Sequence, residues 1–389
     1  MGNYISSNAN RFYAAVESNY GQAAPIAAAN RFPAVKLQAH QVLAPGRRMD
    51  KTGSRTFRGF AATSRRHTAF DVRTYLTSWN GSGEPSYGPL FQAGLGAVPQ
   101  TTASLIVAQM TGLTQIQTTT PHGLAIGGAV SFGGEIRFVT AAPDVSTVIV
   151  NAPFSQLAAA NSALSPAVSY NLATALPSLS IYDFWDPITT VSRLVTGAAV
   201  DVIGIAVNGD FHELTFSGPA ADLLDSTSFA PGSAGLSTFP IEPAPSAFDY
   251  SIVPGHLGQA WLGNTANQFF TLTAANIQIK NHISVRNQEF GSAYPTAVAP
   301  GPREIASSLT LMAQDDAQTR SLYAAAKQRT TISAMLQLGQ QQGSLMGIFL
   351  PSVTPELPAY NDSDTRLHWQ FSNNLAQGGS NDEIYIAFA

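Results

Sequence analysis

Residue types that carry out chemistry are sparse in this chain. It has no cysteine, and its seven histidines form neither an HExxH motif nor a closely spaced pair that would hold zinc. A Gly-x-Ser-x-Gly elbow, a phosphate-binding loop and a Rossmann glycine pattern are also missing. Asp315-Asp316 and Asp362-Ser363-Asp364 fit capping and turn roles better than a calcium-binding loop. We therefore expect no enzyme activity, no catalytic residue, no cofactor and no metal site.

One acidic pair invites a different interpretation. Asp183 and Asp186 flank two aromatic residues, and a glycosidase uses two carboxylates on either side of a sugar. A turn explains the pair better, because a proline follows directly. The neighbouring aromatic side chains of Tyr182, Phe184 and Trp185 leave a glycan-binding surface open as an alternative.

Charge is scarce and unevenly distributed. Only 11% of the residues are charged, compared with about 25% in an average soluble protein. Residues 1–73 hold 11 basic and 3 acidic residues, whereas residues 74–270 hold 2 basic and 12 acidic ones. So few charges make sense on a surface that copies of the same chain cover.

The basic excess is densest between residues 44 and 66. The first five basic residues of this segment are Arg47, Arg48, Lys51, Arg55 and Arg58. A nucleic-acid-binding protein carries such a patch, but this chain is acidic as a whole (net charge −4) and no DNA or RNA motif surrounds the segment. A solvated loop is one alternative. The favoured interpretation is a loop that docks on an acidic face of an identical neighbour.

The hydrophobic pattern predicts a mainly β fold in which one order of elements occurs twice. Alternating apolar and polar residues predict strands at 33–43 and 67–79, with a long loop between them and a short helix at 85–95. Strand, long loop, strand and helix then recur later in the chain, at 276–286, 303–313 and 315–329. We interpret this as a tandem repeat, although the two copies share almost no sequence identity.

Five segments follow from these patterns. We predict an N-terminal arm, a first domain that a small all-β insert interrupts, an extended linker and a second domain. Their respective boundaries are 1–30, 31–99 with 177–225, 100–176, 226–270 and 271–389. The start of the chain does not fit a secretory signal, and no apolar run is long enough for a membrane helix, so we expect no membrane association.

Two stretches carry a family resemblance. Residues 70–79, followed by Glu-Pro-Ser-Tyr-Gly-Pro-Leu-Phe-Gln-Ala-Gly-Leu-Gly at 84–96, resemble the strand and following helix of the major tail tube proteins of long-tailed bacteriophages. Residues 197–202, 208–211 and 214–218 are similar to the strands that come after that helix. The second half fits by its order of elements alone, and the insert looks like the small β domains that decorate virion surfaces.

The resemblance implies tandem α+β tube domains of sandwich or barrel type, each with a packed short helix. It implies a structural virion protein whose rings stack into the hollow tail tube, with transient, non-specific passage of DNA. Each ring would hold three chains with pseudo-sixfold symmetry, or six chains. Arg47, Arg48, Lys51, Arg55 and Arg58 would then make inter-ring contacts.

The resemblance also implies partners and a location. A tape-measure protein and a tail terminator are expected partners, and the chain would be made in the host bacterial cytoplasm and reside in the virion tail. Another tail component, such as a terminator or an inner-tube protein, is the alternative, with a glycan-binding virion module behind it.

Overall fold

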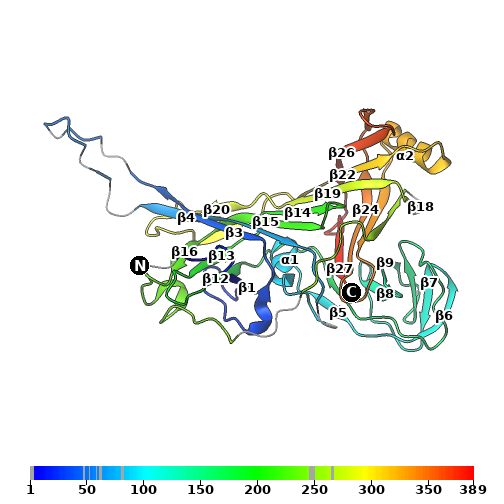
Figure 1. Ribbon diagram of the computed structural model, residues 1–389, viewed down its shortest axis with the longest axis horizontal. Coiled ribbons are helices and arrows are strands. Elements are labelled where there is room, and N and C mark those ends of the chain that lie inside the picture. The colour runs from blue at the N-terminus through cyan, green and yellow to red at the C-terminus, as the bar shows by residue number, and fades with distance from the viewer. Residues whose placement is uncertain are drawn as a thin grey trace.

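The chain folds into stacked β-sheets with only two α-helices among the described residues (Figure 1). This computed structural model describes residues 4–46, 49–51, 53–57, 59–60, 64–79, 83–244, 250–263 and 267–389. Strands account for 45% of the chain and helices for 7%. The prediction of a mainly β fold is therefore confirmed.

One large antiparallel sheet runs along the whole molecule and curls into a half-barrel. Its strands in spatial order are β18 (Asn267–Gln268), β17 (Gly258–Leu262), β23 (Ile332–Leu338), β24 (Met346–Thr354), β26 (His368–Ala376), β22 (Glu304–Met312), β19 (Leu272–Lys280), β14 (Val202–Val207), β15 (Glu213–Ala220), β4 (Arg65–Tyr75) and β3 (Lys36–Ala44). Short strands that join it are β25 (Ala359–Asn361), β27 (Tyr385–Phe388), β11 (Ala167–Tyr170) and β5 (Gln100–Thr102).

Three smaller sheets complete the structure. The second sheet has the order β16 (Asp222–Asp225), β13 (Arg193–Ala198), β12 (Leu179–Trp185), β1 (Asn10–Val16) and β2 (Arg31–Phe32). The insert sheet has the order β6 (Val107–Gly112), β7 (Gln115–Thr118), β10 (Thr147–Val150), β9 (Glu135–Ala141) and β8 (Ala129–Phe132). A two-stranded ribbon pairs β20 (Ser284–Arg286) with β21 (Ala297–Ala299).

The two helices form where the sequence predicts them. α1 spans Gly88–Leu95 and has a proline in its first turn, where a missing backbone N–H does no harm. α2 spans Ala317–Gln328, and the side chain of Asp316 caps it by accepting a hydrogen bond from the Thr319 amide at 2.6 Å. Lys327 lies in its last turn, where a cation interacts favourably with the helix dipole.

The pairing of strands repeats within the chain. In the first repeat, chain order β1, β2, β3, β4, α1, β12, β13, β14, β15, β16 gives the pairings β2-β1-β12-β13-β16 and β3-β4-β15-β14. In the second repeat, chain order β17, β18, β19, β22, α2, β23, β24, β25, β26, β27 gives β18-β17-β23-β24-β27 and β19-β22-β26 with β24 and β25. The long β24 takes the place of β13, and its end together with β25 takes the place of β14. Every pairing in one repeat therefore has a counterpart in the other.

Two predicted boundaries differ from these repeats. The predicted arm at 1–30 contains β1, whose residues 12–15 are buried because β1 lies between β2 and β12 in the middle of a sheet. The predicted linker at 226–270 contains β17 and β18, which open the second repeat. Sequence periodicity missed β1 because both of its faces are covered, so its residues do not alternate.

The insert is attached to both repeats. It leaves the chain between α1 and β12 of the first repeat, yet its core side chains Ile136 and Phe138 cluster with Met335 and Phe349 of the second repeat. Its end strands β5 and β11 extend the large sheet through β27. The predicted all-β composition of residues 100–176 agrees with the strands observed there, but their ends belong to the large sheet.

Arg137 fixes the insert to the second repeat. Its side chain is fully buried, donates to Gln337 Oε1 at 2.8 Å and forms an ion pair with Glu135 at 2.9 Å. Its guanidinium lies 4.0 Å from the ring centre of Trp261, which is close enough for a cation–π interaction. A buried arginine is tolerated here because hydrogen bonds and a carboxylate compensate for the loss of water.

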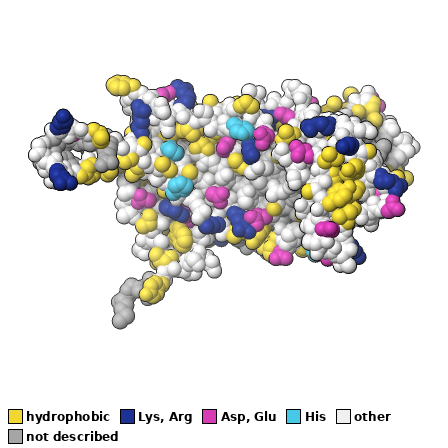
Figure 2. All heavy atoms as spheres, turned by 90° about the horizontal axis from the view of Figure 1, so that it is seen from above, with side chains coloured by type: hydrophobic (Ala, Val, Ile, Leu, Met, Phe, Trp, Pro, Cys, Tyr) yellow, Lys and Arg dark blue, Asp and Glu magenta, His cyan; other side chains and the backbone are white. Residues whose placement is uncertain are grey.

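Among the described residues, the central part of the large sheet is covered on one face only. α1, the second sheet and the insert lie below it in Figure 1, and the opposite face is seen in Figure 2. Inward-facing side chains such as Val72, Phe216, Ile205 and Ile277 are fully buried. Because side chains alternate along a strand, the polar partners of these residues form the open face.

Candidate assembly surfaces

The segment between β3 and β4 projects from one end of the molecule as an arm (Figure 1). Among the predicted inter-ring residues, Lys51 and Arg55 are exposed there, and Arg47, Arg48 and Arg58 lie outside the described residues. The arm also exposes apolar side chains, with Met49 at 84% and Phe60 at 55%. A segment that extends away from its own body with both cations and apolar groups is suited to a contact with another molecule.

The corresponding segment of the second repeat, residues 281–303, lies along the base of this arm. The Arg66 amide donates to the Ala293 carbonyl at 2.9 Å, and the Arg66 guanidinium lies 4.3 Å from the ring centre of Tyr294. The long loop of the second repeat therefore packs against β4, in the β3–β4 pair of the first repeat.

The strand ends opposite the arm carry acidic turns. Asp210 is exposed in the turn between β14 and β15, and Asp362 and Asp364 are exposed in the turn between β25 and β26. Hydrogen bonds from Thr365 hold the pKa of the Asp364 carboxyl below its usual value. Arg366 is exposed in the same turn as Asp362 and Asp364, so the acidic character of this end is confined to single side chains of these turns.

The large sheet ends in unpaired strands within the described part of the chain. β3 pairs with β4 on one side only, and its residues Gln38, His40 and Leu43 are exposed. A second edge lies beside β26, on the side away from β22: β25 pairs with β26 alone among the described strands, and Tyr360 is 58% exposed. Such an unpaired edge presents backbone hydrogen-bonding groups to another strand.

The open face of the large sheet carries few charges, and several are paired across neighbouring strands. Arg73 of β4 pairs with Glu213 of β15, and Lys280 of β19 lies 3.5 Å from Glu304 of β22. In Figure 2 the basic and acidic side chains are interspersed over this face, and the projecting arm shows basic side chains. Cations that already have a carboxylate partner gain little from binding phosphate.

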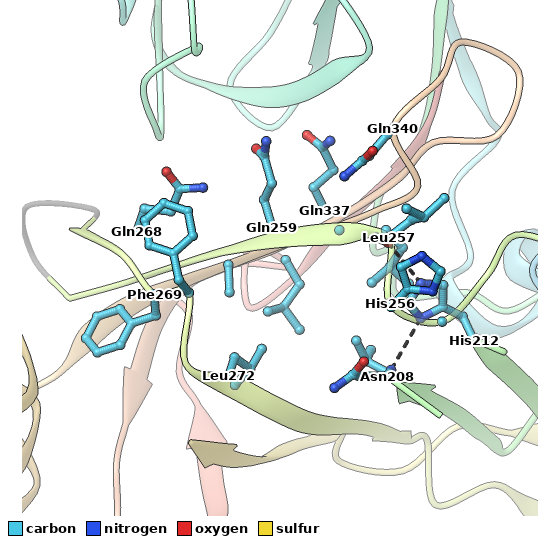
Figure 3. Close-up of a pocket in the computed structure, with 17 residues that line it drawn as sticks. Asn208, His212, His256, Leu257, Gln259, Gln268, Phe269, Leu272, Gln337 and Gln340 are labelled. Atoms are coloured by element: carbon cyan, nitrogen blue, oxygen red, sulfur yellow. Dashed lines mark hydrogen bonds between the residues drawn. The ribbon is translucent and has the colours of Figure 1, made fainter. Parts of the chain in front are cut away.

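A cavity of about 350 Å³ lies where the first repeat meets the second (Figure 3). Its polar side chains are mainly amides, those of Asn208, Gln259, Gln268, Gln337 and Gln340. The buried His212 ring contacts the Leu257 carbonyl at 3.1 Å through Nε2, and burial lowers the pKa of this histidine.

This cavity offers hydrogen bonds but little reactivity. Gln337 contacts Arg137, and Nδ1 of His212 accepts from the Asn208 amide at 3.5 Å, so both already serve structural roles. Among the described residues that line it there is no carboxylate, thiol or lysine to act as acid, base or nucleophile.

The acidic pair of Asp183 and Asp186 is structural in this fold. Asp183 is buried and forms an ion pair with Arg193 at 2.5 Å, whereas Asp186 pairs with Arg11 at 2.6 Å. Tyr182 and Phe184 are buried and stacked on each other, so their rings cannot receive a sugar. In the described ranges, no group of three or more histidine, aspartate or glutamate residues is placed to hold a metal ion.

Comparison with known proteins gives no assignment. Neither a family model nor a curated protein matches this sequence. Within the residues described, neither helix has the length and apolar character needed to cross a lipid bilayer.

Sequence reasoning found the arm but missed the sheet edges and the buried arginine. Edges depend on which strands pair, and pairing between distant segments leaves little trace in local periodicity. Arg137 did leave a signal, because it is one of only three charged residues between 100 and 176 and lies two positions from Glu135.

Proposed function

We propose that this chain is a structural protein that assembles with copies of itself into rings, which stack into a hollow tube for DNA, as in the tail tubes that the sequence resembles. The observation that carries the proposal is the internal repeat: two copies of one unit already share a continuous sheet through β14 and β19. The free edges at β3 and β25 allow the same arrangement to continue from chain to chain.

The layering of the molecule supports closure in one direction. The second sheet, α1 and the insert add bulk to one face of the large sheet. When such units close into a ring, the bulky face takes the larger outer circumference and the open face lines the channel. The channel would then carry paired charges and small polar groups, which suits the passage of a polyanion.

The two ends of the sheet support stacking. The arm with Lys51 and Arg55 projects from one end, and the acidic turns with Asp210, Asp362 and Asp364 lie at the other. A contact between unlike ends does not close on itself, so it generates a filament of rings. The virion location, the tape-measure and terminator partners and the number of chains in a ring belong to the same proposal.

Negative-stain electron microscopy of the purified chain tests this function. We expect hollow tubes or stacked rings, with threefold features in end-on averages if three chains complete a ring. Single rings that never stack would favour a tail terminator. A chain that stays monomeric at high concentration would contradict the proposal. The glycan-binding alternative loses support because Tyr182 and Phe184 are buried.

A further inference from the structure

The junction between the two repeats shows how one unit joins the next. β14 and β19 pair antiparallel, with Ala206 opposite Asn276 and Ile205 opposite Ile277. Ile205 and Ile277 are both fully buried, whereas Ala206 and Asn276 lie on the open face. This junction can serve as a template for pairing between two chains if each of its residues can be matched to a residue at the free edges.

A salt bridge that occurs in each repeat, close to its long loop, identifies equivalent residues of the two repeats. Arg66 of the first repeat pairs at 3.9 Å with Asp222 of β16, the last strand of that repeat. Arg303 of the second repeat pairs at 3.3 Å with Glu383, two residues before β27, which is the last strand of its repeat. Arg66 therefore corresponds to Arg303.

A hydrogen bond at the opposite end gives the same match. The Leu76 amide donates to the His212 carbonyl, and the Ala313 amide donates to the Leu367 carbonyl, each at 2.9 Å. Leu76 is as many residues after Arg66 as Ala313 is after Arg303, so the two markers agree.

The strand ladders carry this match to both free edges. Gln38 faces Asp71 on β4, and Asn276 faces Ser308, the equivalent of Asp71 on β22, so Gln38 corresponds to Asn276. In the same way, Ala206 faces Glu213 and Asn361 faces His368. Glu213 and His368 are equivalent because Glu213 directly follows His212 and His368 directly follows Leu367, the two residues whose carbonyls accept the matching hydrogen bonds.

We infer that β25 of one chain pairs with β3 of a second copy in the register of the internal junction, with Asn361 opposite Gln38 and Tyr360 opposite Ala39. This inference rests on the proposed function and specifies its ring contact. Asn361 and Gln38 then share the open face, and Tyr360 points towards the core like its counterpart Ile205.

The surface beside β3 fits this occupant. A groove of about 500 Å³ runs along that edge and is lined by Leu37, Gln38, Ala39, His40, Phe70, Asp71 and Arg193. Tyr360 is 58% exposed although Ile205, in the equivalent place, has no exposure at all. Its ring stacks on Trp369 with centroids 5.7 Å apart, which holds it in a defined position at the edge.

The absence of native cysteine makes the register directly testable. We would place Gln38→Cys and Asn361→Cys in the full-length chain, oxidise the purified protein under mild conditions and separate it on a non-reducing gel. Residues directly opposite each other in an antiparallel pair have Cβ atoms about 5 Å apart, within reach of a disulfide after a small adjustment. A ladder of covalent oligomers is expected, and its highest rung counts the chains in a closed ring.

Matched controls separate register from mere proximity. Val42→Cys with Asn361→Cys places the thiols on the same face but about 13 Å apart along the strand, so it should give no ladder. Ala39→Cys with Tyr360→Cys tests the neighbouring pair in the same register. Successive pairs in an antiparallel sheet alternate between hydrogen-bonded and non-hydrogen-bonded, so this pair should also crosslink if its Cβ atoms are the closer ones. Equal ladders for matched and mismatched pairs would overturn the register.

Electron microscopy of the same samples separates the two proposals. Rings or tubes without crosslinking in either matched pair would overturn the inferred register and leave the proposed function intact. Neither assembly nor crosslinks would overturn both.

Discussion

The two repeats build the same pairings, but their equivalent residues lie in opposite environments. Ile205 is fully buried at the internal junction, and its counterpart Tyr360 is 58% exposed at the free edge. Six of the eight residues of α1 are buried, compared with three of the twelve residues of α2. The junction within the chain is therefore packed in the single molecule, whereas the equivalent edge at β25 would be packed only in the proposed assembly.

The helix contacts give the physical reason. The Phe91 ring of α1 lies 5.2 Å from Phe388, which belongs to the second repeat, and 5.1 Å from Phe216 of its own sheet. α2 contacts its own sheet through Leu322 and Ala326 and presents residues such as Lys327 to solvent. The open end has its own aromatic cluster around Trp369, formed with Tyr323, Tyr360 and Phe371, but Tyr360 stays 58% exposed there.

The largest effect is expected where the insert joins the second repeat. Arg137→Ala removes one partner of a buried ion pair and leaves Glu135 without its cation, so it should lower the free energy of unfolding by about 3–5 kcal/mol. Urea unfolding followed by tryptophan fluorescence measures this loss, because Trp261 lies against the guanidinium. Limited proteolysis should then release the insert first.

A double variant serves as the control for this prediction. Glu135→Gln with Arg137→Met leaves no buried charge and keeps most of the side-chain volume, so its loss should be smaller than that of Arg137→Ala. A loss below about 1 kcal/mol in Arg137→Ala would show that the insert docks without this clamp.

The next largest losses of unfolding free energy are expected at the equivalent residues Ile205 and Tyr360. Ile205→Ala empties a fully buried site and should cost about 2–5 kcal/mol of unfolding free energy. Tyr360→Ala loses mainly its stacking on Trp369 and should cost about 1 kcal/mol in the isolated chain. In assembly assays the order should reverse, with Tyr360→Ala blocking ring formation in a chain that is still folded. Equal losses in unfolding experiments would mean that the free edge is already packed.

Local pattern predicted much of the fold but not its connections. The strands containing Val72 and Ile305 alternate clearly, and Asp315 or Asp316 was recognisable as a helix cap, so these elements could be placed. β24 could not be assigned its role because one continuous strand takes the place of β13 and shares the place of β14 with β25. β14 and β19 are far apart in the sequence, and periodicity carries no information on which strands pair or in which register.

The candidate site shows the same limit. The basic residues Lys51 and Arg55 were visible as a charge cluster, because charge density is a local property. The free edge at Gln38 and Tyr360 was not, because a strand is an edge only when the rest of the sheet is known.

A smaller, pH-dependent effect is expected at the internal junction. Burial lowers the pKa of His212 below its ordinary value of 6.5, so the neutral ring stabilises the fold above that pH. This contribution is lost as the pH falls through the lowered pKa of the folded chain. Between about pH 7 and pH 5, the native chain should therefore lose more stability than His212→Gln.

The neighbouring histidine is the control. His256 faces the same cavity from an exposed position, so His256→Gln should reduce the pH dependence only slightly. Denaturant midpoints measured across this pH range decide the matter. Parallel pH profiles for the native chain and His212→Gln would show that the junction does not sense this proton.

The smallest effect on folding, and a large one on assembly, is expected at the arm. Lys51→Glu with Arg55→Glu changes exposed residues, so unfolding should shift by no more than about 0.5 kcal/mol. The reversed charges would face the acidic turns of the next ring, so electron microscopy should show rings that no longer stack. Lys51→Gln with Arg55→Gln removes the charge without repulsion and should stack weakly, with native stacking itself weakening as salt rises. Normal tubes from the Glu variant would mean that the arm meets the next ring without attraction between opposite charges. The difference between the two repeats would then affect only how a ring closes.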